Sequence, residues 1–226
     1  MKNRIFYITL FIAFSFFGNS QNVNDFSADN YFNAGNEAYN NKQFGEAVYQ
    51  FEKALLLDPN SQDILINLNL AAERLDADII ALDPFFLASW WRSLSDVFLP
   101  GTWKMGSIIL LIGLLILVFM HLFKNKLTSK LAYSLGSGLI FLILISILTG
   151  VTRAHSIFNN DYAILSGKVD SLLEGPDSVS EKIKPVVSGV KVKILDSNAQ
   201  WYRVATMDSE QGWVLKSEVR LLKFAK

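Results

Sequence analysis

Two long apolar runs near the middle of the chain constrain its fold more than any other feature. They are SIILLIGLLILVFMHLF (Ser107–Phe123) and LAYSLGSGLIFLILISILTGV (Leu131–Val151). Each is close to the ~20 residues that an α-helix needs to cross the hydrocarbon core of a bilayer. Only KNKLTSK separates them. So short a connection predicts an antiparallel hairpin, with transmembrane helices at 103–123 and 131–152.

The charges around the hairpin predict its orientation. The loop 124–130 carries Lys124, Lys126 and Lys130 and no acidic residue. Because short cytoplasmic loops are enriched in Lys and Arg, we expect this loop in the cytoplasm and both flanking regions outside it. The sequence thus predicts a two-pass protein of the inner (cytoplasmic) membrane whose soluble regions are both periplasmic. His121, near the inner end of the first span, is either a functional intramembrane group or an interfacial residue.

The composition excludes several classes of function. Lys and Arg together number 21, as do Asp and Glu, so the chain has no excess of positive charge for binding nucleic acid. The absence of cysteine excludes disulfides, thiolate metal sites and thiol catalysis. His121 and His155 fall on different sides of the predicted membrane, so they cannot share a metal site. We find no phosphate-binding or hydrolase motif, and we expect neither a cofactor nor catalytic activity.

Residues 1–20 have the order of a signal peptide. Lys2 and Arg4 precede the apolar stretch Ile5–Phe17, and the small residues Gly18 and Ser20 follow it. Cleavage is expected after Ser20, and the alternative is an uncleaved N-terminal anchor.

Residues 81–102 predict an amphipathic helix just before the first span. Pro84 suits its first turn and Pro100 ends it. Its apolar residues gather on one side, while Ser95 and Asp96 fall on the other. We expect this helix to lie in the outer membrane–water interface, and the alternative is packing on a neighbouring domain. The tryptophans expected at headgroup level are Trp90, Trp91 and Trp103.

Residues between Ala28 and Ser61 follow the spacing of a tetratricopeptide repeat. The residues that match it are Tyr31, Gly35, Ala47, Phe51, Ala54 and Pro59. Small residues stand where two antiparallel helices would touch, aromatic rings fill the seam, and the proline ends the second helix. Ser61–Leu75 resembles the first helix of a second repeat without a clear second helix. Residues 21–80 are therefore predicted to form one repeat with a capping helix.

This incomplete array offers a small binding surface. Asn36 and Asn67 are expected on its concave side, and Phe32 stands where carboxylate-binding repeats use lysine. The candidate partner-binding residues of the repeat are Phe32, Asn36, Tyr39 and Asn67. Because solenoids usually need about three repeats, we expect a partner protein to complete part of the stacking surface.

Residues 153–226 change to the periodicity of strands. GVKVKIL (Gly189–Leu195) alternates strictly, and YAIL, QWYRVAT and WVLKSEV are further strand candidates separated by DSNA and MDSEQG turns. The elements GVKV, WYRV and GWV resemble those of a bacterial SH3-type domain, which implies a small barrel. Its aromatic residues either form a ligand-binding patch or pack the barrel. They are Trp201, Tyr202 and Trp213.

The order of these modules resembles the BatE family of the aerotolerance (Bat) operon. The expected fold class is a multi-domain membrane protein with an all-α tetratricopeptide repeat, a two-helix transmembrane hairpin and an all-β SH3-like barrel. The resemblance implies von Willebrand factor A-type membrane proteins as partners and, indirectly, a cytoplasmic MoxR-type ATPase. The implied function is a non-catalytic membrane-anchored scaffold in an envelope stress complex. It is expected to bind protein partners in the periplasm through both the repeat and the SH3-like domain. The alternative is a sensor or anchor that binds peptidoglycan through the SH3-like domain.

Overall fold

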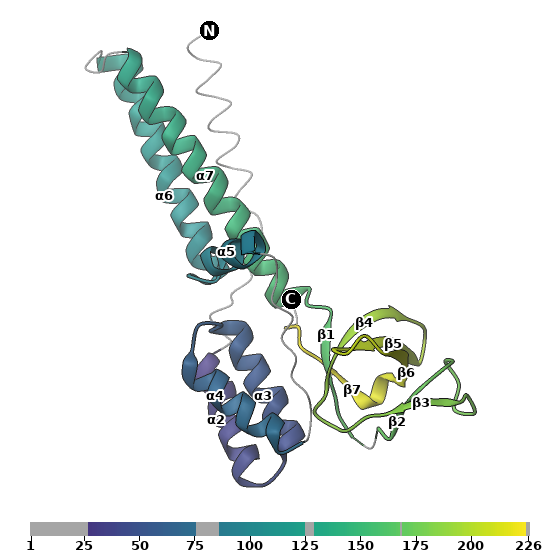
Figure 1. Cartoon of the computed structure of the whole chain (residues 1–226). Coiled ribbons are helices and arrows are strands. Elements are labelled where there is room, and N and C mark those ends of the chain that lie inside the picture. Colours follow the sequence, from purple (N-terminus) through teal and green to yellow (C-terminus); the bar gives the residue numbers. More distant parts are fainter. Residues whose placement is uncertain (1–26, 76–85, 125–128, 168, 225–226) are drawn as a thin grey trace. The chain divides into compact units, whose positions relative to one another are not determined.

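A computed structural model of the chain describes residues 27–75, 86–124, 129–167 and 169–224 (Figure 1). The predicted signal peptide and Lys126 of the predicted loop lie outside the described residues. The chain divides into two compact units. The first contains Trp90–Ala154, and the second joins Phe26–Ser89 to His155–Lys226.

The second unit begins with three helices, α2 (Ala28–Asn40), α3 (Phe44–Leu57) and α4 (Gln62–Glu73). Ser61 caps α4, because its hydroxyl oxygen accepts a hydrogen bond from the backbone N–H of Ile64. The helices bury a shared apolar seam that includes Ala47, Phe51 and Ala54, all fully buried. This helical region is the tetratricopeptide-like structure that the sequence predicts.

The rest of the second unit is an antiparallel sheet of seven strands. They are β1 (Tyr162–Leu165), β2 (Ser171–Leu173), β3 (Lys182–Pro185), β4 (Lys191–Ser197), β5 (Trp201–Thr206), β6 (Gln211–Leu215) and β7 (Val219–Leu221). Their order is β3-β2-β6-β5-β4-β1-β7. In β4, Val192 is buried in the sheet core and Ile194 packs against it, as the alternation predicts.

The sheet is open, and a closed SH3-like barrel is not confirmed. Strands β3 and β7 are its two edges, and no ladder joins them among the described strands. The β7 edge is instead covered by α3. Tyr49 Oη donates to the carbonyl oxygen of Leu221 at 3.5 Å, and Lys53 Nζ donates to that of Lys223 at 3.1 Å. Side chains of α3 thus donate hydrogen bonds to carbonyl groups at the end of β7 and just beyond it.

Three helices make up most of the first unit. They are α5 (Phe86–Ser95), α6 (Pro100–Phe119), which continues as the π-helix η2 (Met120–Lys124), and α7 (Ser129–Phe158). Two of these segments are long and apolar enough to cross a membrane. An 18-residue window within Pro100–Phe123 has a mean hydropathy of 2.6, and one within Ser129–Phe158 has 2.3. Both extend beyond the predicted spans.

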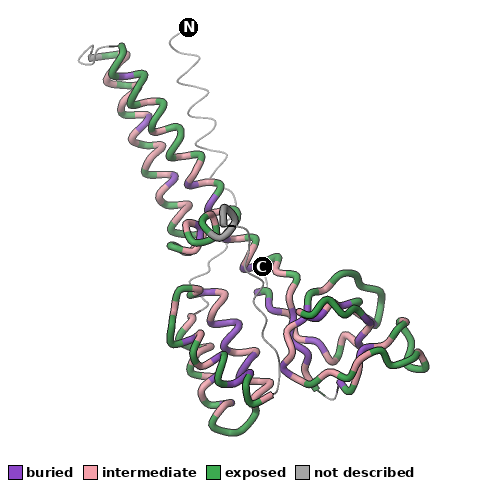
Figure 2. Tube along the Cα trace, in the orientation of Figure 1, coloured by how far each residue is buried: buried purple, intermediate pink, exposed green. Residues whose placement is uncertain are grey.

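Few side chains of the hairpin are buried, as the scarcity of purple along α6 and α7 in Figure 2 shows. Those that are buried include several polar groups. The hydroxyl oxygens of Ser107 and Ser146 lie 2.9 Å apart, and Ser146 Oγ donates to the carbonyl oxygen of Trp103 at 3.0 Å. Apolar side chains therefore face outward, which suits a lipid environment.

The polar side of α5 contacts the hairpin. Ser95 is 2% exposed, and Asp96, which follows α5, pairs with Arg153 of α7 at 3.2 Å. Burial raises the pKa of the Asp96 carboxyl, against the opposing effect of Arg153 and Arg92. A polar face turned to water was the basis for placing this helix in the interface. Ser95 and Asp96 nevertheless lie against the hairpin of the same unit, and the placement of α5 in the membrane interface stays a prediction.

Candidate functional site

The repeat is built around one close approach between α2 and α3. A Cβ atom added at Gly35 would lie 2.5 Å from the ring of Phe51. Glycine is therefore required where the aromatic ring of α3 meets the backbone of α2. Phe32 lies on the other side of this ring, with centroids 5.8 Å apart. These contacts explain why the small and aromatic residues of the repeat occur at fixed spacings.

The candidate partner-binding residues of the repeat are only partly available to a ligand. Phe32 and Tyr39 are half-buried against the helical core, and Tyr39 also stacks on Phe44 with centroids 5.4 Å apart. Asn67 Nδ2 donates to the carbonyl oxygen of Asp63 in its own helix at 2.8 Å. Asn36 is half-buried.

The three aromatic residues of the sheet do not share one face. Tyr202 packs against the buried sheet core with Val204, so the adjacent Trp201 projects from the opposite face. Trp213 lies opposite Arg203 in the β5–β6 ladder and belongs to the face of Trp201. Trp201 is 8% exposed, whereas Trp213 is half-exposed.

The tryptophans of the first unit also differ in how far their side chains are exposed. Trp90 is 62% exposed. Trp91 Nε1 donates to Thr152 Oγ1 at 3.3 Å, and Trp103 Nε1 donates to the carbonyl oxygen of Ser95 at 3.1 Å. One tryptophan is thus open to its surroundings, while the other two hold α5 and the hairpin together.

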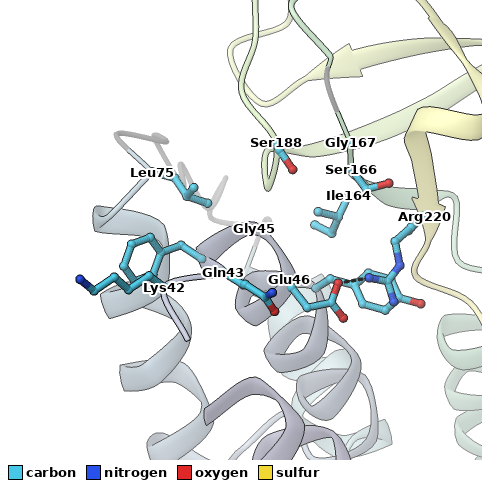
Figure 3. Close-up of a pocket in the computed structure, with 12 residues that line it drawn as sticks. Lys42, Gln43, Gly45, Glu46, Leu75, Ile164, Ser166, Gly167, Ser188 and Arg220 are labelled. Atoms are coloured by element: carbon cyan, nitrogen blue, oxygen red, sulfur yellow. Dashed lines mark hydrogen bonds and ion pairs between the residues drawn. The ribbon is translucent and has the colours of Figure 1, made fainter. Parts of the chain in front are cut away.

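Charged residues of α3 meet the sheet across the second unit. Glu46 pairs with Arg220 of β7, whose guanidinium lies 3.6 Å from the ring centroid of Tyr49 (Figure 3). Glu52, which is buried, accepts a hydrogen bond from Lys191 Nζ at 2.7 Å. The sheet therefore covers one side of α3 within the second unit.

A cavity of about 550 Å³ lies beside these ion pairs. It is lined by Gly45 at the start of α3, by Leu75 after α4, and by Ser166 and Ser188 of the loops that flank β1 and β4 (Figure 3). Gly189 has φ +99°, and an added Cβ would lie 2.9 Å from Gly45 Cα. Two glycines thus let this loop and α3 approach closely.

Lys53 is the most deeply enclosed cation of this interface among the described residues. Its Nζ lies 3.6 Å from the ring centroid of Phe224. Burial, with a smaller contribution from Arg220, lowers the pKa of Lys53 to about 8. Burial also raises the pKa of Tyr31 nearby.

Sequence reasoning did not identify these interface residues. A signal was present, because Glu46, Tyr49 and Lys53 recur at helical spacing on one side of α3. Their partners lie at the other end of the chain, and no local pattern points to them.

Metal chemistry has no candidate in the part of the chain that the structure describes. No group of three or more His, Cys, Asp or Glu residues could hold a metal ion there.

Comparison with known proteins identifies the repeat. The family model of the tetratricopeptide repeat matches residues 28–61. No curated protein matches the chain, and no solved structure matches it. Tetratricopeptide repeats are typically non-catalytic modules for protein–protein interaction, so the matched region indicates binding to protein partners.

Proposed function

We propose that the chain is a non-catalytic membrane-anchored scaffold that binds protein partners through its tetratricopeptide repeat. The observation that carries this proposal is the match of residues 28–61, together with the packing of Phe51 on Gly35 in that segment. The two long apolar helices supply the anchor.

The packing of the second unit supports a two-pass topology with both soluble regions on one side of the membrane. Its helices and its sheet come from opposite sides of the hairpin in the sequence, yet they share a core that includes Phe51, Ile164 and Leu222. Regions that pack together must lie on one side of the membrane, which an even number of spans allows. With the lysines of the connecting loop in the cytoplasm, both soluble regions are periplasmic and the hairpin lies in the inner membrane.

Single cysteines can test this topology, because the chain has none of its own. Asn69→Cys and Ser178→Cys, at exposed positions, are expected to react with a membrane-impermeant maleimide on intact spheroplasts. Ser129→Cys, at an exposed position within the predicted loop, is expected to react only after permeabilisation. Labelling of Ser129→Cys in intact spheroplasts would contradict the orientation.

We further infer that the scaffold belongs to a Bat-type envelope stress complex. The order of signal peptide, repeat, pre-membrane helix, hairpin and C-terminal β-domain supports this assignment. The expected partners are von Willebrand factor A-type membrane proteins and, through them, a MoxR-type ATPase. The same resemblance implies an SH3-like ancestry for the sheet, with α3 now covering one edge.

Co-purification with mass spectrometry tests the docking role. Asn36→Arg and Ile66→Arg, at a half-buried and an exposed position of the repeat, are expected to reduce recovery of partner proteins at least tenfold. Val179→Arg, at an exposed position between β2 and β3, is the matched control. Full recovery of partners by both repeat variants, with folding intact, would refute docking through this region.

Peptidoglycan binding through the sheet is the alternative. It needs accessible aromatic rings, and Trp213 is the best placed of the three candidates. The alternative predicts that the purified full chain sediments with cell wall and that Trp213→Ala abolishes sedimentation. Absence of sedimentation at low salt would exclude it.

A further inference from the structure

Phe224 lies where α2, α3 and the last turn of α7 meet, and that turn, from His155 onward, belongs to the second unit. Its side chain is 3% exposed. Its ring lies edge-on to Tyr31 of α2, with centroids 5.6 Å apart, and beneath Lys53 Nζ of α3 at 3.6 Å. Its backbone N–H donates to the carbonyl oxygen of Ile157, in the last turn of α7, at 3.2 Å. One residue therefore contacts both helices of the repeat and the end of α7.

The neighbours of Phe224 hold it in place. Lys53 Nζ donates to the carbonyl oxygen of Lys223, the preceding residue, at 3.1 Å. Leu222 is fully buried in the core of the helices, and Ile157 is also fully buried. We call this cluster the Phe224 joint, which consists of Tyr31, Lys53, Ile157, Leu222 and Phe224.

We propose that the Phe224 joint is a conformational device that couples the last turn of α7 to the tetratricopeptide repeat. The backbone of Phe224 is bonded to α7, and its ring is enclosed by α2 and α3. Buried side chains are close-packed and change between discrete arrangements rather than deforming smoothly. A displacement of the last turn of α7 is therefore transmitted through Phe224 and loosens the packing of the segment after β7 against α2 and α3.

The charge of Lys53 makes it easier for the Phe224 joint to open, that is, for Phe224 to separate from α2 and α3. Lys53 is a buried cation that faces Tyr31 and Tyr49 and lies close enough to Arg220 to be repelled by it. Hydration of its ammonium group on opening offsets part of the apolar contact that is lost. The Phe224 joint thus combines close apolar packing with one group, the Lys53 ammonium, that becomes better hydrated when the joint opens.

Hydrogen exchange of the full chain in lipid nanodiscs tests the coupling. Ile157→Ala perturbs the last turn of α7, and it is expected to speed amide exchange in α2 and α3 at least tenfold. In a Phe224→Ala background these amides already exchange fast, and Ile157→Ala is expected to add less than twofold. Leu173→Ala, which removes a half-buried side chain of β2, is the matched control and should leave α2 and α3 unchanged.

Two results would overturn the proposal. One is unchanged exchange in α2 and α3 after Ile157→Ala. The other is acceleration by Ile157→Ala that is equally large with and without Phe224→Ala, because the ring would then carry none of the coupling. If Phe224→Ala also removes the protection of β4–β6, Phe224→Leu, which keeps most of the volume and removes the ring, takes its place in the same comparison.

Discussion

The two units of the molecule place their side chains in opposite ways. The second unit buries large apolar groups, among them Phe51, Ile164 and Leu222. In the first unit, buried positions include Ser107, Ser146, Thr149 and Arg153, while phenylalanine, isoleucine and leucine side chains of α6 and α7 are exposed. The difference matches what water favours in the second unit and what lipid would favour in the first. Burial of apolar surface stabilises a unit in water, whereas helices in lipid associate through hydrogen bonds and close packing.

The largest expected effect is on the apolar core of the second unit. Phe51→Ala removes a fully buried ring and is expected to lower the free energy of unfolding by roughly 3–5 kcal/mol. Phe141→Ala, which removes a 63% exposed ring from α7, should change stability by less than about 0.5 kcal/mol. Urea denaturation of the full chain in detergent micelles, read by proteolysis of each unit, measures both. If Phe51→Ala and Phe141→Ala lower the free energy of unfolding equally, the two units do not differ in where they place their stabilising apolar side chains.

The next effect concerns the buried ion pair of the first unit. Asp96→Ala leaves Arg153 without its carboxylate and is expected to cost about 3 kcal/mol of α5 docking. This corresponds to roughly 100-fold faster amide exchange around Trp91. The double variant Asp96→Leu with Arg153→Met replaces both charges by apolar groups, and it should recover most of the loss. If α5 docks as weakly in the double variant as in Asp96→Ala, the ion pair itself holds α5.

The third prediction concerns the buried charge of Lys53 and its effect on the stability of the second unit. Its pKa of about 8 lies below the ordinary 10.5, so between these values the unfolded chain binds more protons than the folded chain. Stability should therefore rise with pH in this window and fall as pH drops through 8. One pKa unit corresponds to ~1.4 kcal/mol, so the full rise would reach about 3 kcal/mol.

Lys53→Met should abolish this rise, and Lys53→Arg, which stays charged, should also show none. Unfolding free energies between pH 7 and about pH 9.5 give the comparison, because the pKa of Tyr31 is raised and its hydroxyl stays protonated there in the folded chain. A rise that persists in Lys53→Met would assign the pH dependence to another group.

The sequence predicted the elements whose signal is local. The length of the apolar runs indicated the helical hairpin, the spacing of Gly35 and Phe51 indicated the repeat, and the alternation around Val192 indicated β4. Strands β2 and β3 were missed because they are short and because β3 is mostly exposed, so neither shows a clear alternation.

The contacts between distant segments could not be predicted. Glu46 meets Arg220, and Glu52 meets Lys191, across more than half of the chain. The contact of α3 with the β7 edge of the open sheet joins segments that are equally far apart in the sequence. Asp96 was expected on a polar surface because its partner, Arg153, lies on another helix. Local periodicity states which residues share a face, and it does not state what covers that face.

The smallest expected effect concerns a hydrogen bond between the two helices of the hairpin. Ser146→Ala removes a hydroxyl that lies 2.9 Å from Ser107 Oγ between α6 and α7. Hydrogen bonds between membrane helices contribute about 0.6 kcal/mol on average, so the hairpin should lose roughly that amount. Ser137→Ala is the matched control, because the hydroxyl of Ser137 is exposed and donates only to Ser134 of its own helix.

Unfolding in mixed micelles measures the stability of each variant. The double variant Ser107→Ala with Ser146→Ala should lose less stability than the two single variants together. If the losses add, the two serines act separately, and close packing near Gly150 and Trp103, where an added Cβ would lie 3.1 Å from Trp103 Cβ, holds the helices together instead.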